Sequence, residues 1–138
     1  MASAFLDTNV LLYANDADDP RRRDVALGLL AKLAGDGGGV ISTQVFVEYA
    51  SVALTKLGQP PADIDRQIEF FESSLQVVMV SATLVRRAVA LTARKDLSYW
   101  DALIIAAAES AGCAEIYTED LSAGQSYAGI RVVNPFTV

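Results

Sequence analysis

Short apolar runs alternate with longer segments of helical periodicity along all 138 residues of this chain. We expect strands at residues 4–6, 40–41, 75–80, 115–118 and 130–133, with helices between them. A crossover between parallel strands needs a dozen or more residues, and the helical segments supply that length. The alternation therefore predicts an α/β fold, a single domain over residues 1–138 with a central, mostly parallel sheet and helices on both faces.

Local signals support several of these elements. Asp19 followed by Pro20 is typical of a helix N-cap and first turn, and Ser42 or Thr43 can cap the helix after the second strand. The run at 75–80 is rich in β-branched residues, which predicts a buried parallel strand.

Composition excludes several kinds of catalyst. The chain has no histidine and one cysteine, Cys113, so the usual zinc ligands and the imidazole base of Ser-His-Asp and Cys-His pairs are missing. Any hydrolysis must use carboxylates. A lone cysteine fits a reducing compartment, and we expect a cytoplasmic protein. The start lacks a basic region, and Asp7 interrupts its short apolar run, so we expect no export signal and no membrane span.

The charge pattern is mixed. A net charge of −6 should repel nucleic acid over the molecule as a whole. Basic residues nevertheless cluster at 21–23, 86–87 and 94–95, where phosphates could be attracted locally. Taken by itself, each cluster is better explained as a solvated helix face than as a phosphate-binding site.

Four carboxylates stand out as candidates for chemistry: Asp7, Glu48, Asp101 and Asp120. In parallel sheets ligands bind at the carboxyl ends of the strands, where two of these residues lie, and the other two lie on helices that could reach the same edge. Each has a purely structural alternative. Asp7 can cap a helix, Asp120 can close a turn, Asp101 can form a capping box with Ser98, and Glu48 can belong to a polar helix face.

A meeting of these carboxylates would favour a cation. Two carboxylates about 4 Å apart repel by about 4 kcal/mol at an effective dielectric constant of about 20. A divalent ion removes that repulsion, and oxygen ligands alone suit Mg²⁺, with Mn²⁺ also accepted. The sequence therefore predicts hydrolysis of a phosphodiester by water that the ion activates.

Four segments carry a resemblance to a known family: FLDTNVLLYA at 5–14, STQVFVEYASVALTK at 42–56, LSYWDALIIAAAESAGC at 97–113, and IYTEDLSAGQSYAGIRVVNPF at 116–136. In these segments the chain closely resembles the PIN domain family, in particular the VapC-type toxins of type II toxin-antitoxin pairs. The resemblance covers nearly the whole chain, and the segments occur in family order.

The resemblance implies that the four carboxylates are the acidic quartet that binds magnesium, with Asp7 and Asp101 as direct ligands. Thr118 would hold Asp7 in place through its hydroxyl group, and Asn9 would orient a ligand or a water molecule. The fourth acid of the quartet can be either Asp120 or its neighbour Glu119.

The resemblance also implies endonucleolytic cleavage of RNA, a homodimer, and an antitoxin that lays a segment into a groove of the toxin. Arg86 and Arg87 would contribute to RNA binding along a basic track of the dimer. Phe70 and Phe71 are neighbours on one helix, so they point to different sides, and we expect core packing for one of them.

Other classes fit the sequence less well. A phosphatase of the haloacid dehalogenase type needs a second acid two positions after the first, where this chain has Asn9. A receiver domain needs a lysine after a late strand, and no lysine follows Lys95. The main alternative is a PIN-like module that binds RNA or protein without catalysis. Such a module is expected to lack one or more of the four acids, and all four are present.

Overall fold

The structure is a computed structural model that describes residues 3–137. Its strands are β1 (Ser3–Leu6), β2 (Gly39–Ser42), β3 (Gln76–Val78), β4 (Cys113–Tyr117), β5 (Ser126–Tyr127) and β6 (Ile130–Val133). Its helices are α1 (Thr8–Ala14), α2 (Pro20–Asp36), α3 (Thr43–Thr55), α4 (Pro61–Ser74), α5 (Ala82–Leu91) and α6 (Tyr99–Ser110).

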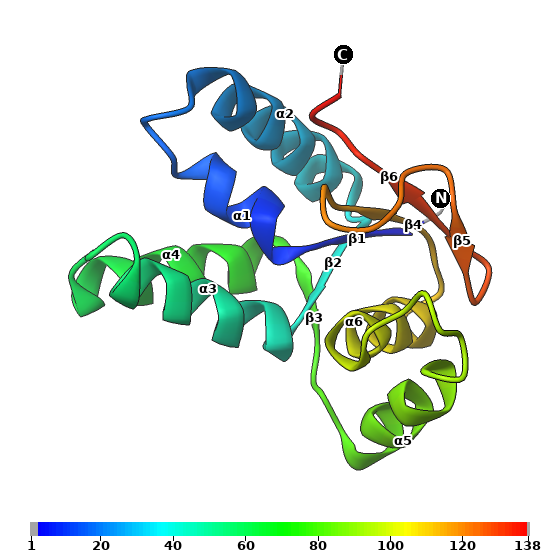
Figure 1. Cartoon of the computed structure of the whole chain (residues 1–138). Coiled ribbons are helices and arrows are strands. Elements are labelled where there is room, and N and C mark those ends of the chain that lie inside the picture. Colours follow the sequence, from blue (N-terminus) through cyan, green and yellow to red (C-terminus); the bar gives the residue numbers. More distant parts are fainter. Residues whose placement is uncertain (1–2, 138) are drawn as a thin grey trace.

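The strands form one sheet in the order β3-β2-β1-β4-β6-β5. All neighbouring strands are parallel except β5, which runs antiparallel to β6. The helices α1 to α4 lie on one side of the sheet, and α5 and α6 lie on the other (Figure 1). The expected α/β fold with a mostly parallel sheet and helices on both faces is thus confirmed.

The order of the strands creates a favourable place for a site. The crossovers through α1 to α4 lead from β1 to β2 and on to β3, whereas the crossover through α5 and α6 returns to β4 on the other side of β1. The direction of winding therefore reverses between β1 and β4. Ligands of open α/β sheets bind beyond the carboxyl ends of the strands at such a reversal.

The core explains why these elements hold together. Phe5 and Leu6 of β1 are fully buried, and α6 is buried along the whole of Ala102–Ala108 because the sheet and α5 cover opposite sides of it. Each large apolar side chain removed from water stabilises the fold by roughly 1.5–3 kcal/mol. Of residues 3–137, no helix is long and apolar enough to cross a membrane.

Two elements differ from the expectations. The run at 75–80 yields only the three-residue strand β3, whose residues are partly exposed because β3 lies at the edge of the sheet; Met79 is 75% exposed. The interpretation as a buried strand was therefore wrong. The two-residue strand β5 was not predicted at all. It pairs with β6 through a tight turn at Ala128 and Gly129, which have φ angles of 52° and 80°.

The capping predictions are confirmed in one place and corrected in another. Asp19 accepts a hydrogen bond from the backbone N–H of Arg22 at 3.2 Å and caps α2. Ser42 occupies the N-cap position of α3 but makes no side-chain capping bond. The hydroxyl of Thr43 instead accepts a hydrogen bond from the backbone N–H of Val80 at 3.0 Å, which ties the segment after β3 to the start of α3.

Candidate active site

Asp7 lies where β1 ends and α1 begins, and its side chain is 6% exposed. Its Oδ1 accepts a hydrogen bond from the backbone N–H of Thr8 at 2.8 Å. Its Oδ2 accepts one from the Thr118 hydroxyl, also at 2.8 Å, so the hydrogen bond expected from Thr118 is present. Because both oxygens have fixed donors, the carboxylate is held in one orientation.

The surroundings of Asp7 raise its pKa from 3.8 to about 6. Burial is the largest cause, because it removes water from the charged form. The negative charges of Asp120 and Glu48 add to the effect, and the hydrogen bonds from Thr118 and Thr8 oppose it only in part. A cation beside Asp7 would favour the ionised form and reverse this balance.

Glu48 points to the same edge from the first half of α3. Its Oε2 accepts a hydrogen bond from the Thr8 hydroxyl at 2.7 Å, and its Oε1 accepts one from Gln44 Nε2 at 2.9 Å. Gln44 also donates to the backbone carbonyl of Trp100 at 3.2 Å. Gln44 therefore links α3 to the beginning of α6.

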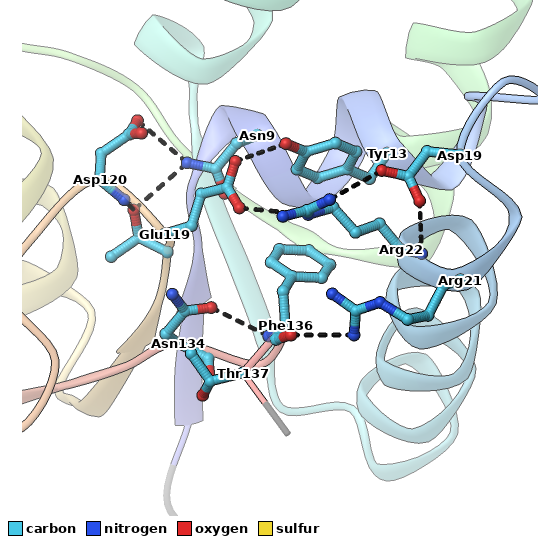
Figure 2. A network of polar contacts seen from close by, with 11 residues as sticks. Asn9, Tyr13, Asp19, Arg21, Arg22, Glu119, Asp120, Asn134, Phe136 and Thr137 are labelled. Carbon is cyan, nitrogen blue, oxygen red and sulfur yellow. Dashed lines mark hydrogen bonds and ion pairs between the residues drawn. The ribbon is translucent and has the colours of Figure 1, made fainter.

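Asp120 reaches this edge from the segment after β4. Asn9 Nδ2 donates to Asp120 Oδ2 at 3.0 Å and to the Thr118 hydroxyl oxygen at 3.3 Å (Figure 2). The Thr118 oxygen also accepts the backbone N–H of Asp120 at 3.1 Å. The Thr118 hydroxyl thus connects Asp7 to the segment that carries Asp120, and Asn9 orients the Asp120 carboxylate.

Glu119 faces away from this cluster. Its carboxylate accepts a hydrogen bond from the Tyr13 hydroxyl and lies 3.5 Å from Arg22 Nε (Figure 2). The hydrogen bond to Glu119 raises the pKa of Tyr13 to about 12. Of the two candidates for the fourth acid, Asp120 is therefore the one that faces Asp7 and Asn9.

Asp101 lies in the first turn of α6, where its backbone N–H donates to the Ser98 hydroxyl oxygen at 3.2 Å. Among residues 3–137, no hydrogen bond or ion pair joins the Asp101 carboxylate to the other three acids. Within the same range, no three acidic or thiol side chains lie close enough together to hold a metal ion.

The convergence expected of all four acids is therefore found only in part. The charges of Glu48 and Asp120 act on Asp7 at the sheet edge, and Asp101 is not among the residues that raise the pKa of Asp7. The physical reason is that neutral partners hold the carboxylates separately: Thr8 and Gln44 bind Glu48, and Asn9 binds Asp120. This arrangement limits the repulsion between like charges.

A hollow of about 540 Å³ opens beside these residues, and Thr8, Asn9, Gln44, Glu48, Trp100 and Asp120 contribute to its lining. The side-chain amides of Asn9 and Gln44 donate through nitrogen to carboxylates, whereas their buried oxygens, Oδ1 and Oε1, accept no hydrogen bond from the described residues. The atoms that these acids and amides can offer to a metal ion are thus all oxygens. In donor chemistry they fit a hard divalent cation, although the carboxylates are not drawn together around one point.

Three of these lining residues were not predicted as site residues. Thr8, Gln44 and Trp100 act through contacts with Glu48 or with one another. The one available signal was the four-residue spacing from Gln44 to Glu48, which places both on one face of α3.

The arginine pair on α5 lies elsewhere. Arg87 binds both carboxylate oxygens of Glu109, at 2.8 and 2.9 Å, and Arg86 is exposed. Glu109 follows Asp101 by eight residues, which is about 12 Å along α6. Arg87 is therefore paired near the end of α6 opposite the site, and a role of the two arginines in RNA binding stays a prediction.

Comparison with known proteins places this geometry in a family. The sequence model of the PIN domain matches residues 4–124. No curated protein matches the chain. Solved structures with a similar fold include VapBC2 of Rickettsia felis bound to a promoter DNA fragment, a toxin-antitoxin complex of Klebsiella pneumoniae, and the sarcin-ricin loop cleaving toxin VapC20 of Mycobacterium tuberculosis.

These similarities extend over almost the full length of both chains. The Rickettsia structure has a TM-score of 0.69 at 18% identity and covers 94% of this chain and 96% of its own. The Klebsiella structure has a TM-score of 0.68 at 22% identity and covers 99% of this chain and 100% of its own. The Mycobacterium toxin has a TM-score of 0.69 at 20% identity and covers 94% of this chain and 99% of its own. At such identities the likeness concerns the fold, and the family follows from the sequence match over most of the chain. The chain belongs to the PIN domain family.

Proposed function

We propose that this protein is a magnesium-dependent endoribonuclease and the toxin of a type II toxin-antitoxin pair. The observation that carries the proposal is the buried Asp7, whose pKa is raised to about 6 beside Glu48 and Asp120 at the reversal point of the sheet. A buried carboxylate with a strongly shifted pKa is typical of a functional site. The toxin-antitoxin structures that share the fold support the same class of function.

In this proposal Asp7, Glu48, Asp101 and Asp120 hold the ion, with Mn²⁺ as an alternative to Mg²⁺. When bound, the ion supplies positive charge that offsets the charge of the phosphodiester and makes a water molecule easier to deprotonate. Thr118 keeps Asp7 oriented, and Asn9 keeps Asp120 directed at the same place. Glu48 faces the hollow and is placed to accept a proton from the attacking water.

We propose RNA as the substrate and an antitoxin protein as the partner. An apolar groove between α2 and α4 supports the proposal of an antitoxin partner, because it offers a surface on which a segment of that partner could bind. Its two hollows, of about 320 and 210 Å³, share Leu27, Leu30, Phe70 and Phe71. Phe71 is 2% exposed and packs in the core as expected for one of the pair, whereas Phe70 is 61% exposed and available to an antitoxin segment. We also propose that the protein forms a homodimer and works in the cytoplasm.

A second candidate function is a PIN module that binds RNA without cleaving it. The observation that favours it is the separation of the carboxylates, since no three of them lie together among residues 3–137. The two functions differ in what a metal ion does. A nuclease needs the ion to convert its substrate, whereas a binding module leaves RNA intact under all conditions.

The test is to incubate the purified protein with total RNA in Mg²⁺, in Mn²⁺ and in a chelator. We expect cleavage with either metal and none with chelator, and we expect Asp7→Asn and Asp101→Asn to abolish it. Asp36→Asn, which removes an exposed carboxylate at the end of α2, is the matched control and should cleave normally. Cleavage that persists in chelator and in both site variants would refute the mechanism.

A further inference from the structure

Gln44 contacts two helices through a single amide nitrogen. It is the second residue of α3, about one turn before Glu48, and its side chain is almost fully buried, with 8% exposed. Its Nε2 donates to Glu48 Oε1 at 2.9 Å and to the backbone carbonyl of Trp100 in α6 at 3.2 Å. Both hydrogens of the amide nitrogen are therefore used, one within α3 and one on α6.

The two partners decide which way this amide faces. An ionised carboxylate and a carbonyl oxygen only accept hydrogen bonds, so the nitrogen of the Gln44 amide must face them. A reversed amide would place Gln44 Oε1 against two other oxygens. Glu48 is held on its other side as well, because its Oε2 accepts the Thr8 hydroxyl at 2.7 Å. The orientations of Gln44 and Glu48 are thus fixed together.

The contact with Trp100 acts on the backbone next to Asp101. The carbonyl of Trp100 and the N–H of Asp101 belong to one planar peptide unit. Gln44 binds the carbonyl, and the Ser98 hydroxyl oxygen accepts the N–H at 3.2 Å. Side chains therefore hold both polar ends of this peptide unit. Among the described residues, the hydrogen bond from Gln44 is also the only one between α3 and α6.

The fold keeps this amide at a cost. Gln44 Oε1 is buried and accepts no hydrogen bond from residues 3–137. A buried polar atom without a partner lowers stability, and a methionine of similar length would avoid the loss. Packing of α3 alone would be served at least as well by methionine. What methionine cannot supply is the pair of hydrogen bonds to Glu48 and to the turn that carries Asp101, and departures from good packing of this kind occur at functional sites.

We propose that Gln44 is a positioning residue, whose amide group sets the separation between Glu48 and the turn of Asp101 so that both acids can reach one divalent ion. The Asp101 carboxylate stays free to turn, but its backbone is held at a fixed place relative to Glu48. This inference rests on the proposed function and adds a residue outside the four acids.

Binding of Mn²⁺ in the absence of RNA tests the proposal without relying on cleavage. In calorimetric titrations of the full chain, Gln44→Met should lower the affinity for Mn²⁺ by about 10-fold, as is typical when a residue that orients metal ligands is lost. Gln67→Met is the matched control. Gln67 is a half-buried glutamine of α4 that forms hydrogen bonds with Tyr49 and Gln59, and its loss should leave the affinity for Mn²⁺ unchanged. Urea unfolding without metal measures what each substitution does to stability alone.

The place of Gln44 between two acids allows a sharper test. In an Asp101→Asn background, Gln44→Met should lose most of its effect on Mn²⁺ affinity, because the turn that Gln44 holds no longer carries an acid. In an Asp120→Asn background the effect should remain about 10-fold, because Asn9 and not Gln44 contacts Asp120. A Gln44 that only supports the fold would weaken binding by the same factor in both backgrounds, and that result would overturn the proposal.

The remaining outcomes separate this inference from the proposed function. If the unmodified protein binds Mn²⁺ and cleaves RNA but Gln44→Met binds Mn²⁺ equally well, Gln44 does not position the acids and the function stands. If Gln44→Met and a second variant, Gln44→Leu, both fail to fold, Gln44 is a structural residue and the inference is overturned. If the unmodified protein neither binds Mn²⁺ or Mg²⁺ nor cleaves RNA, the proposed function fails, and this inference fails with it.

Discussion

Asp7 and Asp101 were expected to do the same work, yet the fold treats them in opposite ways. Asp7 is almost fully buried at the end of a central strand, with a hydrogen-bond donor on each oxygen. Asp101 lies half-buried in the first turn of a helix, and its carboxylate contacts none of the other three acids within residues 3–137. One acid is fixed before any ligand arrives, and the other is free to turn towards one.

The difference teaches that orientation and stability oppose each other at this site. Fixing Asp7 requires burial, and burial raises its pKa from 3.8 to about 6. Asp101, in the first turn of α6, is only half-buried, so less of its side chain is removed from water. The following predictions test this contrast, beginning with the largest effect.

Asp7→Asn should reduce RNA cleavage by at least about 10³-fold, because the site loses the charge that anchors the ion, and several kcal/mol of transition-state stabilisation depend on it. Single-turnover cleavage of a labelled RNA measures the loss. Asp101→Asn should give a loss of similar size if both acids bind the ion directly. A loss below about 10-fold for Asp101→Asn would show that the fixed acid is sufficient.

The same two substitutions should differ in their effect on stability. The raised pKa means that folded Asp7 binds its proton more tightly than unfolded Asp7, so stability falls as the pH rises from about 4 to about 6 and stays lower above that. At about 1.36 kcal/mol per pKa unit, the cost at neutral pH is about 3 kcal/mol.

Asp7→Asn should therefore stabilise the protein at pH 8 by about 1–2 kcal/mol, once the loss of two hydrogen bonds to a carboxylate is subtracted. The gain should vanish near pH 4, whereas Asp101→Asn alters a half-buried side chain and should change the free energy of unfolding by less than about 0.5 kcal/mol. Urea unfolding at both pH values measures these differences. If Asp7→Asn stabilises the protein equally at pH 4 and pH 8, the raised pKa does not belong to Asp7.

Thr118→Val removes the hydroxyl that holds Asp7 without changing the size of the side chain. We expect cleavage to fall about 10-fold, within the range typical for residues that orient a metal ligand. The pKa of Asp7 should rise further, because a hydrogen bond that favours its charged form is lost. The acidic limb of the pH-rate profile should accordingly move to higher pH, whereas Thr83→Val, on the exposed side of α5, should leave the profile in place.

The smallest effect is expected at Glu119, which faces away from the hollow. Glu119→Gln should change cleavage by less than about 2-fold, because its carboxylate is engaged with Tyr13 and Arg22. Asp120→Asn, one residue further on, should cost at least about 10-fold. Steady-state cleavage rates of the two variants decide which residue is the fourth acid, and the reverse order would assign that place to Glu119.

Much of this architecture could be predicted because it follows from local patterns. The end of β1 at Asp7 follows from an apolar run that stops at a polar residue, and the cap of α2 follows from Asp19 and Pro20. The hydrogen bond from Thr118 to Asp7 came from the family resemblance, and the structure contains it.

The remaining features depend on neighbours that are distant in the sequence. The exposure of β3 follows from its edge position, which its own residues do not encode, and β5 is too short to show any periodicity. The side-chain links from Thr8 to Glu48 and from Gln44 to Trp100 depend on how helices pack. For the same reason Asp101 could be placed at the start of α6, but the direction of its carboxylate could not be predicted.

The pairing of β4 with β1 also has a consequence during synthesis. Asp7 receives its second hydrogen-bond donor from Thr118, 111 positions later in the chain, and β4 needs β6 on its other side. A nascent chain that has not yet released the segment through β6 therefore has the first acid without the hydroxyl that orients it. The site around Asp7 is therefore assembled only after β6 has been translated.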